Sequence, residues 1–239
     1  MHPEWLSNAY VIGDKPGGIA VFVDSGAPLR PLFDAVSRHG LTVTHLLTTH
    51  ADADHIAGDS AILGRYDCRV VKGDLETGGL SIKALPTPGH KDDHLAFVVN
   101  DELCCTGDVL FKDAVGGGDF EQIRRSVMDV LMQLPHELRV YPGHTDETTI
   151  GREWEENPFV RVWRGVEPEG TEAVRVGGEE AVLVVWRGAE PEGIEPVRVG
   201  GEDATLIVWS PDYDGKGKAW VRFADGRDAI VGGSRVERG

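Results

Sequence analysis

The sequence predicts an α/β layered domain at residues 1–160, followed by a small all-β domain at residues 161–239. Up to about residue 160, apolar strand-like runs alternate with segments of helical spacing, and this alternation is typical of a sheet covered by helices. Beyond that point a 23-residue repeat dominates, and its tryptophans lie at positions 163, 186 and 209. We interpret the repeat units as strands joined by tight turns.

Changes in hydrophobic period locate the elements of the first domain. The run at residues 41–49 is apolar and β-branched, which favours a buried strand. Helical spacing occurs at residues 28–39, where Gly40 provides a stop, and again at residues 55–66 and 123–134. Strands are expected at residues 9–14, 18–26, 41–49, 68–73, 80–85, 94–100, 102–107 and 137–144.

The second domain is expected to hold six or seven strands. Each repeat unit is interpreted as a strand, an EPEG turn, a strand, a Gly-Gly turn and a strand, with the glycine pairs at residues 177–178 and 200–201. The three tryptophans have apolar neighbours, so we expect them to be core residues of the repeats. Packing against the first domain, or pairing of subunits in a homo-oligomer, is the other role open to them.

Composition and charge exclude several function classes. A formal net charge of −16 argues against a nucleic-acid partner, which needs a basic face. No apolar segment approaches the roughly 18 residues that span a bilayer, and the first ten residues do not resemble a secretory signal. We therefore expect a cytoplasmic protein without a membrane partner. Cys68, Cys104 and Cys105 are expected to be reduced, buried side chains.

The strongest motif is the segment His50-Ala51-Asp52-Ala53-Asp54-His55, which follows a predicted buried strand. In an extended loop alternate side chains share a side, so His50, Asp52 and Asp54 can point the same way. His55 then enters from the start of the next helix. Four imidazole and carboxylate groups within six residues can surround one or two cations.

Three more candidate ligands follow later strands. They are His90 in TPGH, Asp108 in TGD and His144 in YPGH, and each comes directly after a glycine that permits close backbone approach. Loops that carry carboxylate and imidazole groups at one edge of a sheet are what a hydrolytic metal site requires. The sequence therefore predicts a metal centre with seven candidate ligands: His50, Asp52, Asp54, His55, His90, Asp108 and His144.

These motifs also resemble a known family. The string from His50 to His55 is similar to the H-x-H-x-D-H signature of the metallo-β-lactamase superfamily, and TPGHKDDH, CTGDVLF and YPGHTDETTIG resemble later motifs of its glyoxalase II-like (hydroxyacylglutathione hydrolase-like) branch. The resemblance covers roughly residues 7–160, with the motifs in the same order. It implies an αββα sandwich with two divalent metal ions, zinc, iron or manganese, at its rim.

The resemblance also implies a role for each residue. His50 and His90 would hold one metal ion, with Asp52 in the place of the usual second histidine. Asp54, His55 and His144 would hold the other, and Asp108 would bridge the two. Asp54 and Asp108 would be the catalytic residues, Asp54 by orienting the nucleophilic hydroxide. His94 matches a further histidine of the family motif and is expected to support the ligands without binding metal.

Asp52 departs from the family pattern. A third carboxylate would leave less residual positive charge on the two cations, which makes them weaker Lewis acids. Oxygen in place of nitrogen also favours harder ions such as manganese or iron over zinc. We predict that Asp52→His shifts the metal content toward zinc and lowers the pH at which activity rises. The alternative is that Asp52 points away and leaves one metal site empty or loose.

The resemblance suggests hydrolysis of a thioester or a related small ester by a metal-activated hydroxide. Glyoxalase II proper has a helical C-terminal domain that binds glutathione, whereas this C-terminal region is predicted to be β, so the thiol carrier stays open. One alternative is a persulfide dioxygenase that uses one iron held by His50, His90 and Asp108. Another is a scaffold protein that binds a partner through the β-repeat domain. Lys112, Arg124 and Arg125 are candidates for holding an anionic substrate group or are simply solvated charges.

Overall fold

The computed structural model describes residues 6–169, 172–176, 179–183, 197–199, 202–210 and 217–237. The N-terminal part begins with a four-stranded sheet in the order β1-β2-β3-β4, in which β2, β3 and β4 are parallel and β1 is antiparallel. Its strands are β1 (Tyr10–Gly13), β2 (Ile19–Val23), β3 (Thr42–Leu47) and β4 (Arg69–Val71).

A second sheet of six strands has the order β12-β11-β8-β7-β6-β5. Only the β11–β8 pair is parallel; the other neighbours are antiparallel. Its strands are β5 (Leu75–Thr77), β6 (Leu80–Pro86), β7 (Leu95–Val99), β8 (Leu103–Gly107), β11 (Arg139–Pro142) and β12 (Thr148–Thr149), and the short pair β9 (Leu110–Phe111) and β10 (Ala114–Val115) lies beyond β8. The short strands β5, β9, β10 and β12 were not expected from the sequence.

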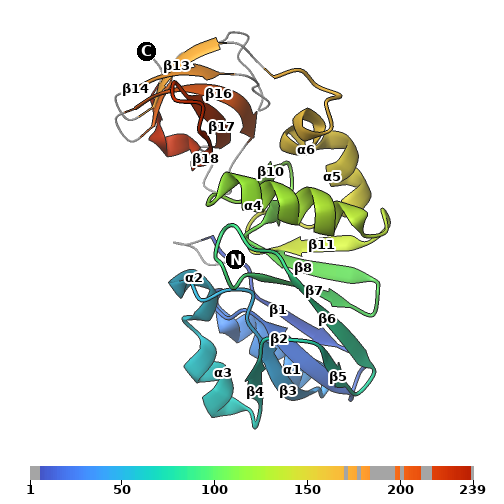
Figure 1. Ribbon diagram of the computed structural model, residues 1–239. Coiled ribbons are helices and arrows are strands. Elements are labelled where there is room, and N and C mark those ends of the chain that lie inside the picture. Colours follow the sequence, from blue (N-terminus) through green and yellow to red (C-terminus); the bar gives the residue numbers. More distant parts are fainter. Residues whose placement is uncertain are drawn as a thin grey trace.

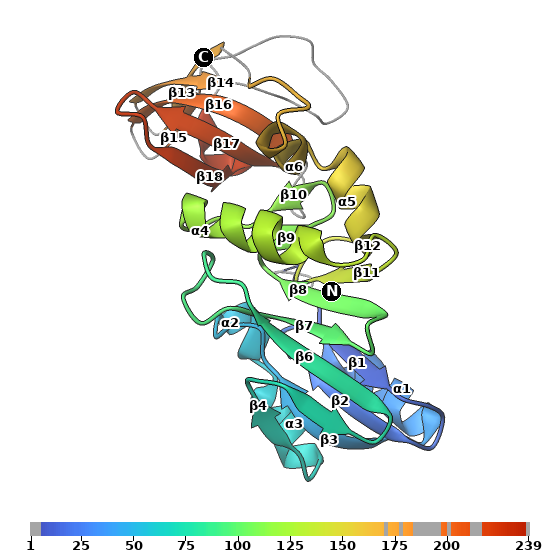
Figure 2. The ribbon, with the colours of Figure 1, turned by 45° about the vertical axis from the view of Figure 1, so that its right-hand side comes forward.

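Helices cover the outer faces of both sheets, as Figures 1 and 2 show. Val36 of α1 and Ile62 of α3 share one apolar cluster with Phe22 and Leu46 of the first sheet. The inner faces of the two sheets meet in a second cluster, which joins strands β2 and β3 to strands β6, β7 and β8. The order of layers is therefore helix, sheet, sheet, helix. The helices are α1 (Leu29–His39), α2 (Ala53–Ile56), α3 (Asp59–Arg65), α4 (Phe120–Arg125), α5 (Ile150–Glu156) and α6 (Pro158–Trp163).

Local signals explain where the helices begin and end. Gly40 adopts a left-handed conformation (φ 64°) and ends α1. The side chain of Asp119 accepts a hydrogen bond from the backbone N–H of Gln122 and caps α4. The helical segment expected at 123–134 begins earlier, at Phe120, and changes pitch through a π-helical turn (Ser126–Val130) and a 3₁₀ turn (Leu131–Gln133).

The interpretation of the segment around Trp163 as the first strand of the repeats is wrong. Trp163 is the last residue of helix α6. This helix begins at Pro158, because the Asn157 side chain accepts hydrogen bonds from the backbone N–H groups of Phe159 and Val160 and proline is favoured at the first helical position. The 23-residue period therefore begins in a helix. Residues 1–160 and 161–239 remain our proposed domains, with α6 crossing the boundary.

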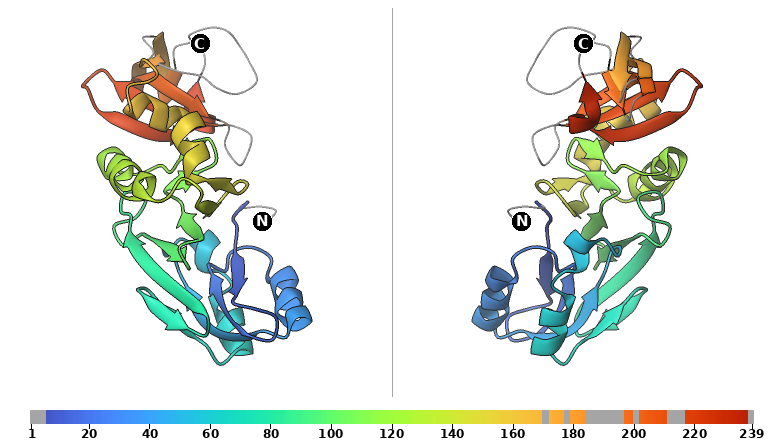
Figure 3. Two further views of the ribbon diagram at one scale, coloured as in Figure 1. Left: turned by 90° about the vertical axis from the view of Figure 1, so that its right-hand side faces the viewer. Right: turned by 90° about the vertical axis from the view of Figure 1, so that its left-hand side faces the viewer.

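The C-terminal part is a seven-stranded, mainly antiparallel sheet, seen at the top of Figure 3. The strands described are β13 (Glu172–Val176), β14 (Glu179–Leu183), β15 (Val197–Val199), β16 (Glu202–Ser210), β17 (Lys218–Phe223), β18 (Asp228–Gly232) and β19 (Val236–Glu237). Trp186, the glycine pairs at 177–178 and 200–201, the second EPEG turn and the side chain of Trp209 lie outside the described residues.

This sheet packs on α4 and α6 through aromatic side chains. The rings of Phe120 and Trp220 lie 4.9 Å apart, and those of Trp163 and Trp220 lie 6.1 Å apart. Trp220 and Ile230 belong to the same buried cluster as Val115 of the first domain. Trp163 thus packs between the two parts of the chain, which is one of the roles expected for it.

The three cysteines are free, and Cys104 and Cys105 are buried, as the sequence predicted. The expectation of burial is wrong for Cys68, which is only partly buried because it directly precedes the edge strand β4. Across the described ranges, no helix has the length and apolar character needed to span a bilayer.

Candidate metal centre

Five of the seven predicted ligands lie in loops at the ends of strands from both sheets, and Asp54 and His55 lie in the short helix α2. His50 follows β3, His90 follows β6, Asp108 follows β8 and His144 follows β11. Because β8 and β11 are parallel and pair Gly107 with Pro142, Asp108 and His144 leave the sheet side by side. Three sets of side chains have donor atoms within 4.8 Å of one another: His50, Asp52 and His90; His50, His55 and Asp108; and Asp54, His55 and His144.

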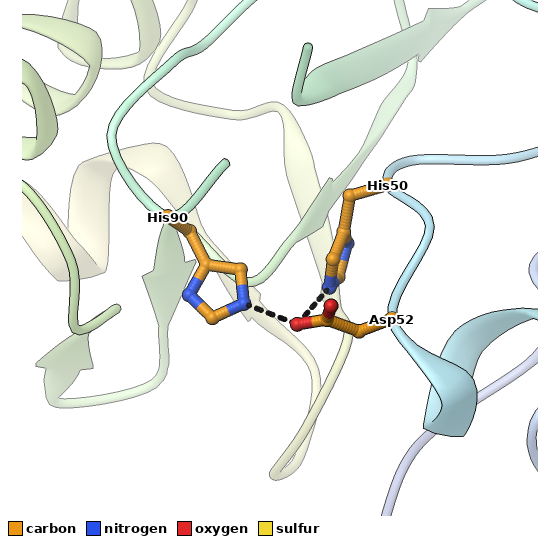
Figure 4. Close-up of side chains that lie close together, drawn as sticks. All are labelled: His50, Asp52 and His90. Atoms are coloured by element: carbon orange, nitrogen blue, oxygen red, sulfur yellow. Dashed lines mark hydrogen bonds and ion pairs between the residues drawn. The ribbon is translucent and has the colours of Figure 1, made fainter. Parts of the chain in front are cut away.

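We call His50, Asp52 and His90 the outer group, shown in Figure 4. Oδ2 of Asp52 lies 3.3 Å from Nε2 of His90 and 3.8 Å from Nε2 of His50. The His50 side chain is fully buried, whereas those of Asp52 and His90 are 35% and 22% exposed. The expectation that Asp52 shares a side with His50 therefore matches the geometry.

We call Asp54, His55 and His144 the inner group. Oδ2 of Asp54 lies 3.4 Å from Nε2 of His144 and 3.6 Å from Nε2 of His55. Both imidazoles are buried, and Asp54 is the one member of this group that reaches solvent. The hydrogen bond from His144 lowers the pKa of Asp54, so this carboxylate is ionised at neutral pH.

Asp108 lies between the two groups. Its carboxylate oxygens are 3.3 Å from Nε2 of His55, 3.2 Å from Nε2 of His144 and 3.8 Å from Nε2 of His90. Burial opposes ionisation of this side chain, but the adjacent imidazoles of His144 and His55 hold the pKa of Asp108 well below its usual range. A buried anion flanked by imidazoles of both groups is suited to bridging two cations.

Unsatisfied polar atoms indicate that the centre is built to hold something further. Among the described residues, Nε2 of His50, Nε2 of His55 and Oδ1 of Asp108 are buried and have no hydrogen-bond partner of acceptable geometry. Buried polar atoms without partners are costly and rare in native proteins. All three point into the same cluster and are donor atoms typical of zinc, iron and manganese sites. The residues therefore fit a metal centre.

The opposite nitrogens of the imidazoles are held by hydrogen bonds. Nδ1 of His55 lies 2.9 Å from Oδ2 of Asp24, and Nδ1 of His50 lies 3.0 Å from Oγ1 of Thr49, which donates to the same Asp24 oxygen. The carboxylate of Asp24 also accepts from the backbone N–H of Thr49. One buried aspartate thus orients a histidine of each group, and such partners strongly affect metal affinity.

Backbone carbonyls orient the other two imidazoles. Nδ1 of His90 lies 2.9 Å from the carbonyl oxygen of Gly117, and Nδ1 of His144 lies 3.0 Å from that of Leu6. A neutral imidazole in this position donates its Nδ1 hydrogen and leaves Nε2 free to bind metal. All four histidines of the two groups therefore present Nε2 to the centre.

His94 has a different place. Its Nε2 accepts a hydrogen bond from the backbone N–H of Asp108, and its Nδ1 lies 2.9 Å from Oγ1 of Thr87. Both ring nitrogens of His94 are engaged in these contacts. The imidazole therefore holds the Asp108 loop in place and has no nitrogen left to bind metal with the inner or outer group. Burial lowers the pKa of His94 to about 3, which keeps the ring neutral.

The glycines that precede the ligands are required sterically. A Cβ on Gly143 would lie 2.2 Å from Oδ1 of Asp108, and one on Gly107 would lie 2.5 Å from Nε2 of His94. Gly107 also has φ +47°, in the left-handed region. Small residues here allow the loops to approach each other closely enough to form the centre.

The histidines differ in their affinity for protons. Burial and the neighbouring His55 lower the pKa of His50 to about 4. Burial acts in the same direction on His55 and His144, but contact with Asp108 and other carboxylates raises their pKa values to about 11 and about 9. The carboxylates therefore attract positive charge to the inner group, and a metal ion that binds there displaces protons.

Two residues that contact the candidate ligands were not predicted from the sequence. Asp24, an acidic residue directly after the buried strand β2, gave a signal similar to that of the candidate ligands but was not singled out. Lys91, which forms an ion pair with Asp52, lies within the TPGHKDDH motif, but the sequence indicated no role for it. Of the basic candidates, Lys112 pairs with Asp146 near the His144 loop at 3.4 Å. Arg124 lines a cavity between α4 and the C-terminal sheet, and none of the seven predicted ligands lines this cavity.

Comparisons with known proteins agree with the geometry. The family model described as the metallo-beta-lactamase superfamily matches residues 2–78. A hydroxyacylglutathione hydrolase of Rhodopseudomonas palustris is 35% identical over 158 residues, which cover 56% of this chain and 61% of the relative. This chain thus spans less than two thirds of the length of that enzyme.

Two solved structures are similar in sequence and fold. ETHE1 from Myxococcus xanthus is 30% identical with a TM-score of 0.59, and the match covers 67% of this chain and 82% of that one. TTHA1623, crystallised in a di-iron-bound form, is 26% identical with a TM-score of 0.56, covering 66% of this chain and 97% of the other. The chain belongs to the metallo-beta-lactamase superfamily, and its N-terminal part has the αββα fold that the sequence predicted.

Proposed function

We propose that the protein is a metal-dependent hydrolase that cleaves a thioester or a related small ester, with two divalent metal ions bound by the inner and outer groups. The observation that carries this proposal is the pair of ligand groups that share Asp108, with unsatisfied donor atoms aimed into the space between them. The hydroxyacylglutathione hydrolase similarity supports the thioester class.

Each residue has a role in this reaction. Bound metal ions would supply a water molecule of lowered pKa as the nucleophile and would polarise the carbonyl of the substrate. Asp54 is 28% exposed and lies beside His144, so its carboxylate is placed to accept a hydrogen bond from the attacking water. Asp24, Leu6 and Gly117 keep the imidazoles in the tautomer that binds metal.

A second candidate is a persulfide dioxygenase. It is favoured by the arrangement of His50, His90 and Asp108, two imidazoles and one carboxylate, which suits a single iron. This activity would not need the inner group. The inner group therefore distinguishes the two candidates.

The test uses wild-type protein and the His144→Ala variant, each reconstituted with zinc, manganese or iron. Release of free thiol from hydroxyacyl thioesters of glutathione and of other small thiols measures hydrolysis, and oxygen uptake with a persulfide measures the alternative. We expect thioester cleavage by wild-type protein and a loss of at least about a hundredfold in the variant, because one metal ion is no longer held.

Oxygen uptake that survives in the His144→Ala variant, without thioester cleavage by either protein, would favour the dioxygenase. Thioester cleavage that is the same in both proteins would contradict the role of the inner group.

A further inference from the structure

The two carboxylate oxygens of Asp52 are divided between different partners. Oδ1 lies 2.8 Å from Nζ of Lys91, while Oδ2 faces Nε2 of His90 at 3.3 Å and Nε2 of His50 at 3.8 Å. Figure 4 shows Asp52 directed toward the two imidazoles. One oxygen is therefore occupied by an ammonium group, and the other is left for the outer group.

The backbones of both partners are held in place. The carbonyl oxygen of Asp52 accepts hydrogen bonds from the N–H groups of His55 and Ile56 at the start of α2. The carbonyl oxygen of Lys91 accepts from the N–H groups of Gly89 and His94. Because Lys91 directly follows His90, the ion pair and the imidazole contact come from the same tight loop.

The ion pair contributes little to folding. The Lys91 and Asp52 side chains are 44% and 35% exposed, and exposed ion pairs are weak because solvent screens them and side-chain entropy opposes them. Fold stability therefore does not explain why one Asp52 oxygen contacts Lys91 while the other faces the two imidazoles.

The charge of Lys91 indicates a role at the candidate metal centre. A carboxylate in the place of a neutral imidazole adds one negative charge to the outer group, and the Lys91 ammonium at 2.8 Å returns one positive charge to the same side chain. With Lys91 counted, the reduction in metal Lewis acidity expected from Asp52 alone is largely offset. A carboxylate that donates one oxygen and has its charge compensated approximates a neutral ligand with one donor atom.

We propose that Lys91 is a positioning residue that presents Asp52 to the metal through Oδ2 alone and compensates its charge. This inference rests on the proposed function, because it requires a metal ion in the outer group. Lys91 and Asp52 then act as a unit in place of the histidine that the family signature has at this position.

The experiment measures metal affinity by competition with a chromophoric chelator, for Zn²⁺ and Mn²⁺ separately. The variants are Lys91→Met, Lys91→Arg, Asp52→His and the double variant Asp52→His/Lys91→Met. The matched control is Lys72→Met, since Lys72 makes a similarly exposed ion pair with Asp93 at 2.9 Å. Thermal unfolding of the metal-free proteins tests whether any variant is simply unfolded.

We expect Lys91→Met to weaken one of the two metal equivalents by about tenfold, within the range for residues that support metal ligands, and to leave the other unchanged. Lys91→Arg should retain most of the affinity, and Lys72→Met should match wild type. In the Asp52→His background, removal of Lys91 should no longer weaken binding, because an imidazole needs no compensating charge.

Equal metal affinities in the Lys91→Met and Lys72→Met variants would overturn the proposal. It would also be overturned if Lys91→Met reduced metal affinity by the same factor in the wild-type and Asp52→His backgrounds. In both cases wild-type protein still binds two ions and the proposed function stands. If wild-type protein binds no metal after reconstitution, the proposed function fails, and the role of Lys91 fails with it.

Discussion

The inner and outer groups contain similar candidate ligands in different surroundings. The inner imidazoles of His55 and His144 are at most 2% exposed, and His55 is backed by the buried carboxylate of Asp24. In the outer group only His50 is buried, while Asp52 and His90 face solvent and Asp52 is backed by the surface residue Lys91. The inner group is held by the core of the fold, whereas two of the three residues of the outer group lie on partly exposed loops. The departure from the family pattern, Asp52, lies in this more exposed group.

The largest effect is expected from substitution of Asp108, because it contacts imidazoles of both groups. Asp108→Ala should weaken both metal equivalents by at least about a hundredfold, whereas Asp54→Ala should weaken only one. Metal content after gel filtration measures this difference, and Asp108→Asn offers a closer isostere if the alanine variant does not fold. One equivalent retained at wild-type affinity in the Asp108 variants would show that the groups are independent.

A smaller effect is expected at Asp24, which touches no metal site directly but bonds to His55 and Thr49. Asp24→Asn should reduce metal affinity by roughly 10–100-fold, mainly for the inner group. Asp59→Asn is the control, because this nearby half-buried carboxylate bonds to Ser25 and to none of the candidate ligands. Equal losses in the two variants would mean that general destabilisation, and not orientation of His55, is responsible.

The smallest effect concerns a histidine that belongs to neither group. Burial and the neighbouring Arg69 lower the pKa of His45 below its ordinary value of 6.5, so the folded state binds fewer protons than the unfolded chain. Stability should therefore fall as the pH drops through the window below 6.5. In His45→Gln this part of the acid sensitivity should be absent, which urea unfolding of the metal-free proteins at pH 7.5 and 5.5 would reveal. Identical pH dependence in both proteins would assign all of the acid sensitivity to other groups.

The sequence predicted the layered fold, because hydrophobic period is a local signal. Position at strand ends indicated the candidate ligands, whose side chains the structure brings together in three sets. The strand expected around Trp163 was wrong, since the cap formed by Asn157 and Pro158 outweighed the repeat pattern. Asp24 and Lys91 could not be assigned roles from spacing, because their contacts to His55 and Asp52 depend on how distant loops pack. The contacts that the carbonyl oxygens of Leu6 and Gly117 make with His144 and His90 could not be predicted, because a backbone carbonyl is present at every residue.

The most direct test is the number of metal ions bound per chain in reconstituted wild-type protein, measured by inductively coupled plasma mass spectrometry after gel filtration. Two groups that share Asp108 predict two ions per chain. A single ion per chain, or none, under conditions in which metal is in excess before the gel filtration, would contradict the two-group centre.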